Sequence, residues 1–266
     1  MVTINVGKNW NKFMTSIQFS HANGFPTKTY EYLFSMLKTK DIHFINTMGH
    51  IESTYKQDLI HLQEELIQDI EQRNNGPVIG IGHSSGAAAT LLAAAKRPDL
   101  FKEVILLDPV LLGRKKRFGI DLMKKLGLWA RFSLTQKAKR RRVYFKDKQQ
   151  AYDYFKNKSL FKKFHPKCFD SYIEHGLKPS IEGVELSFST QVEADIFTHV
   201  PTKIPKNLSN IKGTIIYGLD SDVFEKADVA WWTKTFPEFA MIAYPGKHLF
   251  PFEQPEETAE LINKYL

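Results

Sequence analysis

Apolar residues in the first hundred positions fall into short continuous runs separated by stripes with helical spacing. Four short runs predict strands: 16–20, 41–48, 77–81 and 104–107. Two stripes in which apolar residues recur every three or four positions predict amphipathic helices over 29–39 and 55–73, and an alanine-rich helix is expected to end near Arg97. The last two strands are apolar throughout rather than alternating. This favours a parallel sheet with both faces covered by helices.

The pattern changes after this region. Residues 111–210 contain no comparable apolar strand and are rich in Lys, Arg, Phe and Tyr, with helices expected at 151–155 and 166–175. Strand patterns return at 213–218 and 240–244, and they are followed by helix patterns at 229–235 and 255–265. A hundred structureless residues would be unusual in a compact domain. The sequence therefore predicts one α/β domain, formed by 1–110 and 211–266, with a helical cap over 111–210.

Length and composition indicate how large a core the chain can form and where in the cell it is expected. The chain has 266 residues, of which 42% are hydrophobic, enough for a full core. It has no run of about 18 apolar residues, and residues 1–8 lack the basic-then-apolar order of a signal peptide. Cys168 is the single cysteine, which excludes an internal disulfide and favours a buried free thiol. We therefore expect a cytoplasmic protein without membrane insertion.

Charge is distributed unevenly. The net charge is +8, but residues 111–178 hold 20 basic and 5 acidic residues, a local balance of +15, which leaves 17 basic and 24 acidic residues elsewhere. Basic clusters occur at 114–117 and 137–142. One interpretation is a solvated surface. The other is attraction of anionic substrates, a membrane surface or nucleic acid.

The candidate nucleophile is Ser84. It lies in Gly82-His83-Ser84-Ser85-Gly86, directly after the strand at 77–81 and before the alanine-rich helix. Such a strand–turn–helix holds its serine in a strained, exposed conformation, which small neighbouring residues permit. The free N–H groups at the helix start can stabilise negative charge nearby. The alternative is a tight turn that happens to contain a serine.

A serine hydroxyl needs a base and an acid that orients this base. Of nine histidines, His248 follows the last strand and precedes the last helix, so it should face the same sheet edge as Ser84. His83 is expected to point away, His21 to organise its loop, and His50 is a candidate pocket residue. The other five are expected to be surface or packing residues: His43, His61, His165, His175 and His199.

For the acid, residues 218–224 follow a strand and contain two aspartates. We favour Asp222, with Asp108 and Asp220 as alternatives.

Two backbone N–H groups are needed to stabilise an oxyanion. Ser85 is expected to supply one and the loop at 21–26 the other, through Asn23 or, alternatively, Phe25.

With these residues placed, the chain resembles the α/β-hydrolase superfamily, particularly its small capped esterase-like members. The resemblance rests on four motifs: 21–26, 82–86, Gly218 with Ser221-Asp222, and Gly246-Lys247-His248. It implies a catalytic domain formed by 1–110 and 211–266, with 111–210 as its lid. Two features depart from the family pattern: little chain precedes the first strand, and Asp222 lies four residues after Gly218 rather than the commoner three.

The leading hypothesis is a serine hydrolase that cleaves carboxylic esters of short to medium chain length, including anionic ones, through an acyl-enzyme on Ser84. Carbon–carbon bond hydrolysis or thioester hydrolysis by the same residues is the alternative. A different class, a non-catalytic protein that binds nucleic acid or membrane through the basic cap, is less favoured. The chain has no P-loop, dinucleotide glycine pattern, CxxC pair or metal-ligand spacing, so we expect no cofactor and no metal. The complete set of candidate serine, histidine and aspartate residues disfavours nucleic-acid binding, so we expect no nucleic-acid partner.

Overall fold

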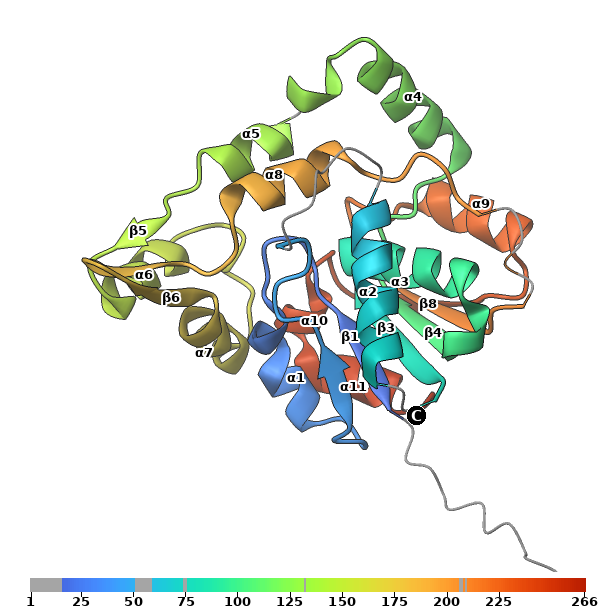
Figure 1. The fold of residues 1–266 in the computed structure, drawn as a ribbon, viewed down its shortest axis with the longest axis horizontal. Coiled ribbons are helices and arrows are strands. Elements are labelled where there is room, and N and C mark those ends of the chain that lie inside the picture. The colour runs from blue at the N-terminus through green and yellow to red at the C-terminus, as the bar shows by residue number, and fades with distance from the viewer. Residues whose placement is uncertain (1–15, 51–58, 74–75, 132, 206–207, 209) are drawn as a thin grey trace, which may run out of the picture.

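A computed structural model describes residues 16–50, 59–73, 76–131, 133–205, 208 and 210–266. Its main feature is a six-stranded sheet in the order β2-β1-β3-β4-β8-β9, with every neighbouring pair parallel (Figure 1). The strands are β1 (Ile17–Ser20), β2 (Ile42–Phe44), β3 (Val78–His83), β4 (Phe101–Leu107), β8 (Gly213–Gly218) and β9 (Ala240–Tyr244). The predicted parallel α/β fold is confirmed.

Alternate side chains of the strands enter two separate cores. Ile105 and Leu107 of β4 pack into one core, whereas Val104 and Leu106 pack into the other. The first core lies under α1 (Glu31–Ser35) and α11 (Pro255–Ile262), and the second under α2 (Ile60–Arg73), α3 (Ser85–Lys96) and α9 (Lys226–Thr235). The sheet therefore needs apolar side chains on both faces, which explains the continuous apolar runs in the sequence.

Some boundaries differ from those the sequence predicts. The helix expected at 29–39 is a 3₁₀ turn, η1 (Thr27–Tyr30), followed by the short α1, and the strand expected at 41–48 is limited to β2. Residues 1–8 and the first part of the helix expected at 55–73 lie outside the described residues. The main domain also contains the 3₁₀ turn η2 (Pro98–Leu100) and the short α10 (Phe250–Glu253). A further 3₁₀ turn, η3 (Trp129–Arg131), lies between β4 and β8.

The segment between β4 and β8 is an insertion of helices and a small sheet. Its helices are α4 (Arg114–Lys125), α5 (Ser133–Lys139), α6 (Lys148–Lys156), α7 (Pro166–His175) and α8 (Thr190–Thr198). The sequence did not predict its antiparallel sheet β5-β7-β6, formed by β5 (Tyr144–Phe145), β6 (Leu177–Ser180) and β7 (Gly183–Leu186). These strands are too short and too polar to give a clear strand pattern.

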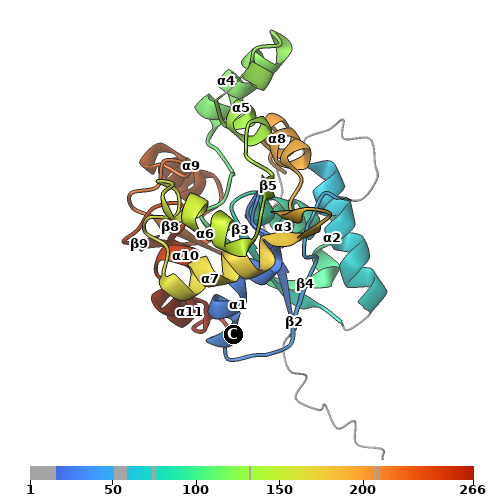
Figure 2. The ribbon, with the colours of Figure 1, turned by 90° about the vertical axis from the view of Figure 1, so that its left-hand side faces the viewer.

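The insertion has two parts that differ in packing. Aromatic side chains of α6, α7 and their connection, such as Phe161 and Tyr172, belong to the same core as Phe25 and Phe252 of the main domain. Helix α4 instead belongs to a small separate cluster and extends away from the sheet (Figures 1 and 2). No helix in the described part of the chain is both long and apolar enough to cross a membrane.

Candidate active site

Ser84 lies on the sharp turn between β3 and α3, as the sequence predicts. Its φ of 57° is in the left-handed region, which non-glycine residues adopt at a cost of about 1–3 kcal/mol. Gly82 and Gly86 are required because backbone atoms lie too close to them to leave room for a side chain. A Cβ on Gly82 would lie 2.5 Å from the Ala87 Cα, and one on Gly86 would lie 2.3 Å from the carbonyl oxygen of Ser20. The turn therefore holds Ser84 in a fixed, strained position.

His248 lies in the loop between β9 and α10 and reaches the Ser84 hydroxyl. Its Nε2 is 2.9 Å from Ser84 Oγ, and its Nδ1 is 2.6 Å from Asp108 Oδ2. Because a carboxylate accepts, the geometry assigns the ring proton to Nδ1, and Nε2 is left to accept from the Ser84 hydroxyl. Ser84 is 6% exposed and Asp108 is fully buried. This arrangement can transfer a proton from the serine to the imidazole.

Asp108 follows β4 directly and, like Ser84, has a positive φ, of 41°. Its Oδ1 accepts from the Gly218 backbone N–H at 2.8 Å, and its Oδ2 accepts from the Ser221 hydroxyl at 2.5 Å as well as from His248. A fully buried carboxylate is expensive unless it is paired or hydrogen-bonded. These three donors compensate for its burial and fix its orientation toward the imidazole.

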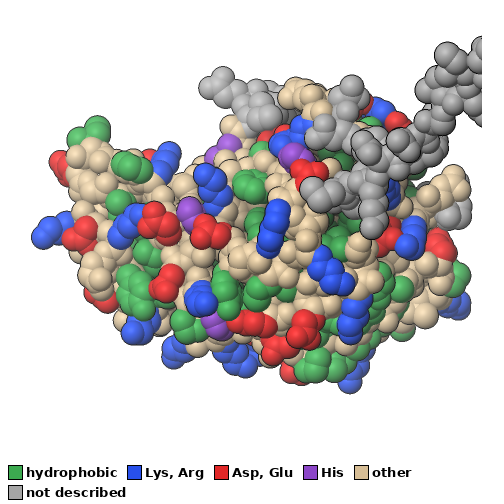
Figure 3. Space-filling model, turned by 90° about the horizontal axis from the view of Figure 1, so that it is seen from below, with side chains coloured by type: hydrophobic (Ala, Val, Ile, Leu, Met, Phe, Trp, Pro, Cys, Tyr) green, Lys and Arg blue, Asp and Glu red, His purple; other side chains and the backbone are tan. Residues whose placement is uncertain are grey.

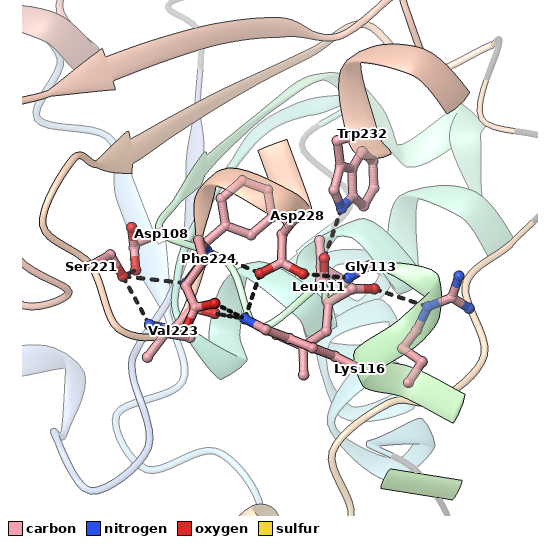
Figure 4. A network of polar contacts seen from close by, with 12 residues as sticks. Asp108, Leu111, Gly113, Lys116, Ser221, Val223, Phe224, Asp228 and Trp232 are labelled. Carbon is pink, nitrogen blue, oxygen red and sulfur yellow. Dashed lines mark hydrogen bonds and ion pairs between the residues drawn. The ribbon is translucent and has the colours of Figure 1, made fainter. Parts of the chain in front are cut away.

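The preference for Asp222 as the partner of His248 is corrected by this geometry. Asp222 is exposed, as is Asp220, and neither is hydrogen-bonded to His248 among the described residues. The loop after β8 turns Ser221 inward instead, and Figure 4 shows this hydroxyl beside Asp108. The Ser221 Oγ also accepts from the backbone N–H groups of Val223 and Phe224, at 3.1 and 3.3 Å. This loop therefore supports Asp108 through Ser221 and places no carboxylate of its own on His248.

The two expected oxyanion donors are the backbone N–H groups of Ser85, which follows Ser84 in the chain, and of Asn23, in the loop after β1. Ser85 is the first residue of α3, where N–H groups have no partner within the helix. In the loop at 21–26, the Phe25 N–H donates to the Ala22 carbonyl at 3.1 Å, which leaves it engaged in a turn. The Asn23 backbone N–H has no acceptor within the described part of the chain. This favours Asn23 over Phe25.

His83 was expected to point away from the site, and its ring lies buried against the backbone of His248. Its Nε2 donates to the carbonyl of His248 at 3.0 Å, and its Nδ1 accepts from the Tyr30 hydroxyl at 2.7 Å. Tyr30 in turn accepts from the Ala22 N–H at 3.1 Å. Burial lowers the pKa of His83 to about 3, so the ring is neutral. This chain of hydrogen bonds joins the loop at 21–26 to the loop that carries His248.

His21 and His50 hold loops rather than reaching the serine. Burial lowers the pKa of His21 to about 4; its Nδ1 donates to the Ala22 carbonyl at 2.9 Å and its Nε2 accepts from Met48 N–H at 2.8 Å. His50 accepts from the Ser189 N–H at 2.9 Å, at the start of α8, and burial lowers its pKa too. His21 therefore organises its loop, as the sequence predicts.

The insertion contacts the loop at 21–26 through a charged pair. Arg141 and Glu193 form an ion pair, and the Tyr172 hydroxyl accepts from Arg141 at 2.8 Å. A Cβ on Gly24 would lie 3.1 Å from the Glu193 carboxyl group and 3.2 Å from the Arg141 guanidinium. The Asn23 side-chain amide donates to the Glu193 carbonyl at 2.9 Å. The sequence does not predict this pair, since nothing in the spacing of Arg141 and Glu193 along the chain links them.

The site shows no arrangement that would hold a metal. Within the described ranges, no three or more His, Cys, Asp or Glu side chains converge as metal ligands would.

Comparisons with known proteins agree with this fold. The model of the alpha/beta hydrolase family matches residues 22–261. Two curated relatives match over part of their length: monoglyceride lipase of Rattus norvegicus is 32% identical over 103 residues, which cover 35% of this chain and 34% of the lipase. Lipase LipV of Mycobacterium tuberculosis is 38% identical over 56 residues, 20% of this chain and 22% of that protein. The chain thus spans about a third of the length of the monoglyceride lipase and about a fifth of the length of LipV.

Solved structures match nearly the whole chain at low identity, so they bear on the fold alone. E-2-(acetamidomethylene)succinate hydrolase has a TM-score of 0.74 and 18% identity, and the match covers 94% of this chain and 90% of that one. A thioesterase domain from the curacin biosynthetic pathway has a TM-score of 0.68 and 16% identity, over 93% and 90% of the two chains. The chain belongs to the alpha/beta hydrolase family.

Proposed function

We propose that this alpha/beta hydrolase cleaves carboxylic esters of short to medium chain length, with Ser84 as nucleophile, His248 as base and Asp108 as the acid that orients it. The observation that carries the proposal is the continuous hydrogen-bonded path from Ser84 Oγ through both ring nitrogens of His248 to a buried carboxylate, 2.9 and 2.6 Å long at its two steps. These residue types in this geometry activate a serine hydroxyl for attack on an acyl carbon.

The proposed reaction has two halves. As Ser84 Oγ bonds to the ester carbon, its proton passes to His248 Nε2. The developing oxyanion accepts from the backbone N–H groups of Ser85 and Asn23. His248 then gives the proton to the departing alcohol, which leaves an acyl group on Ser84. A water molecule, deprotonated by His248, attacks this acyl group, and the proton returns to Ser84 as the acid is released. Asp108 remains ionised throughout and holds the ring in place.

We also propose that residues 111–210 act as a cap. The Arg141–Glu193 pair lies against Gly24, and Tyr172 packs on Phe25 with ring centres 5.6 Å apart. Ser84 is only 6% exposed. A cover of this kind excludes water from the developing charges, which strengthens each electrostatic interaction inside.

Esters are favoured over the alternative substrates by the relatives that match in sequence. Both are described as lipases, and lipases act on carboxylic esters. Thioesters and carbon–carbon bonds next to a carbonyl present the same acyl carbon to the same three residues, so they stay as the alternative. Arg141 is already paired with Glu193, so it supplies no free cation to an anionic substrate.

The test is a panel of chromogenic esters of increasing acyl length, with one thioester and one diketone, on the wild type and Ser84→Ala. We expect ester hydrolysis in the wild type and a loss on the order of a millionfold in kcat in the variant, because the nucleophile is absent. Ser35→Ala, at an exposed serine of α1, is the matched control and should keep full activity.

A fluorophosphonate probe supplies an independent readout because it labels an activated serine whatever the natural substrate. Labelling should map to Ser84 and disappear in Ser84→Ala. Labelling of another serine in an active preparation would overturn the assignment. Cleavage of the thioester or diketone in preference to every ester would move the proposal to that substrate class.

A further inference from the structure

Helix α4 shows an unusual distribution of side chains. Its exposed side carries Phe118 and Leu122, which are 72% and 47% exposed, and Leu126 follows at its C-terminal cap with 62% exposure. These residues are spaced by four, so they line one side of the helix. Isolated exposed apolar residues are ordinary, whereas a contiguous apolar stripe marks an interaction surface.

The cations on the opposite side of α4 attach it to Asp228 of the main domain and to the backbone of the insertion itself. Lys116 Nζ donates to Asp228 Oδ2 at 2.7 Å, and Asp228 Oδ1 accepts from the Gly113 N–H at 2.7 Å (Figure 4). The Arg117 Nε donates to the Leu112 carbonyl at 2.9 Å, and Lys124 Nζ to the Val200 carbonyl at 2.8 Å. The helix is thus attached by the side that carries Lys116 and the buried Ile120, so the side that carries Phe118 faces outward.

Charge surrounds the apolar stripe. Helix α4 contains six basic residues and one acidic residue, a net +5, and Arg114, Lys115 and Lys125 are exposed on the same side as Phe118. The face of the molecule seen in Figure 3 differs, because acidic and basic side chains are interspersed on it. A helix with an exposed apolar stripe bordered by Lys and Arg suits the surface of an anionic lipid bilayer. There the apolar side chains contact the acyl chains, and the cations pair with the headgroups.

We propose that the apolar stripe of α4, formed by Phe118, Leu122 and Leu126, docks on the surface of an anionic lipid membrane. Two other occupants fit less well. A second copy of the chain would bring two +5 helices together, and like charges oppose such contact. Nucleic acid would pair with the cations but leave the exposed stripe without a partner. This docking does not depend on the reaction at Ser84.

The test is co-sedimentation of the full chain with vesicles of phosphatidylcholine mixed with phosphatidylserine, and with vesicles of phosphatidylcholine alone. The wild type should bind the anionic vesicles more tightly than the neutral ones. The double variant Phe118→Ser/Leu122→Ser should bind anionic vesicles at least about tenfold more weakly, since it loses the inserted apolar area. Leu160→Ser is the matched control, because Leu160 is 49% exposed but lies outside α4, and it should bind as the wild type.

The contribution of the cations is tested with the double variant Arg114→Gln/Lys115→Gln. It should bind anionic vesicles about tenfold more weakly than the wild type and bind neutral vesicles equally well. Circular dichroism and hydrolysis of a water-soluble ester by each variant check that the fold is kept. If the wild type cleaves no ester at all, the proposed function fails while the vesicle result still stands.

Three results would overturn the docking proposal. The first is equal vesicle binding by the wild type and the Phe118→Ser/Leu122→Ser variant. The second is binding of an RNA oligonucleotide together with no binding to vesicles. The third is a dimer in solution that the double variant abolishes, again with no vesicle binding.

Discussion

The sheet edge around Ser84 and helix α4 break the rule of apolar inside and polar outside in opposite directions. At the sheet edge, Asp108, His83 and His21 are buried, and each has hydrogen-bond partners that make burial tolerable. On α4, Phe118 and Leu122 are exposed while Lys116 reaches an almost fully buried carboxylate. Burying polar groups costs free energy that their hydrogen bonds must offset, whereas an exposed apolar stripe leaves a surface that a partner can cover. The comparison therefore points to two working regions.

The largest effect is expected at the sheet edge, from Asp108→Asn. The amide can no longer hold the imidazole in the required tautomer, so kcat should fall by about 10⁴-fold. Asp222→Asn, at an exposed residue of the neighbouring loop, should change kcat by less than about twofold. Steady-state kinetics on one ester compare the two. If Asp222→Asn lost activity and Asp108→Asn kept it, Asp222 and not Asp108 would be the acid that orients His248.

The buried histidines should make folding sensitive to acid. The pKa of His83 is lowered to about 3 and that of His21 to about 4, against about 6.5 in the unfolded chain. Below pH ~6.5 the unfolded chain binds more protons than the folded chain, so the free energy of unfolding decreases as the pH is lowered. At pH ~5.5 each ring is expected to lower it by about 1.4 kcal/mol relative to neutral pH. Urea unfolding at pH ~7.5 and ~5.5 measures this.

His83→Gln is the variant that isolates one of these terms. It removes one titrating ring, so its difference in unfolding free energy between the two pH values should be smaller than that of the wild type by about 1.4 kcal/mol. An identical pH dependence in the variant would mean that His83 is not kept neutral by burial.

The next effect concerns the contact between the insertion and the loop at 21–26. Glu193→Gln weakens the pair with Arg141 and loosens the support of Gly24 and Asn23. Losing an oxyanion donor costs about 10²–10³-fold in kcat, and displacing one should cost less, about tenfold, with KM unchanged. Glu185→Gln, which loses a 3.1 Å ion pair with Lys178 away from this loop, is the control. Equal kcat for both variants would show that the pair plays no part in positioning.

The smallest effect is expected on the exposed side of α4. Phe118→Ser removes a side chain that is 72% exposed, so the free energy of unfolding should change by less than about 0.5 kcal/mol. On the opposite side, Ile120 is 7% exposed and packs with Leu112 and Trp129, so Ile120→Ala should cost about 2 kcal/mol. Thermal and urea unfolding compare them. Equal losses would mean that Phe118 is buried in solution.

Much of the main domain was predictable because its signals are local. The apolar runs at 213–218 and 240–244 are β8 and β9 to the residue. β8 is apolar because it lies inside the sheet and is covered on both faces, whereas β9 is an edge strand in which only Tyr244 is buried. The turn at Ser84 was predictable for a similar reason, because a strand that reverses into a helix needs small residues beside the serine. His248 followed from position alone, as the histidine between the last strand and the helices that end the chain.

Tertiary structure decided what depends on neighbours that are distant in the chain. Asp108 and Asp222 both follow strands of one parallel sheet, so sequence order places both at the same edge, and only the fold shows that Asp108 is buried against His248 while Ser221 takes the inward place in the other loop. The pairing of Arg141 with Glu193 and the outward apolar side of α4 are decided in the same way. The sequence determined the sheet, the turn at Ser84 and the place of His248 after the last strand, because local backbone and burial requirements leave a pattern along the chain. Partners brought together by folding leave none.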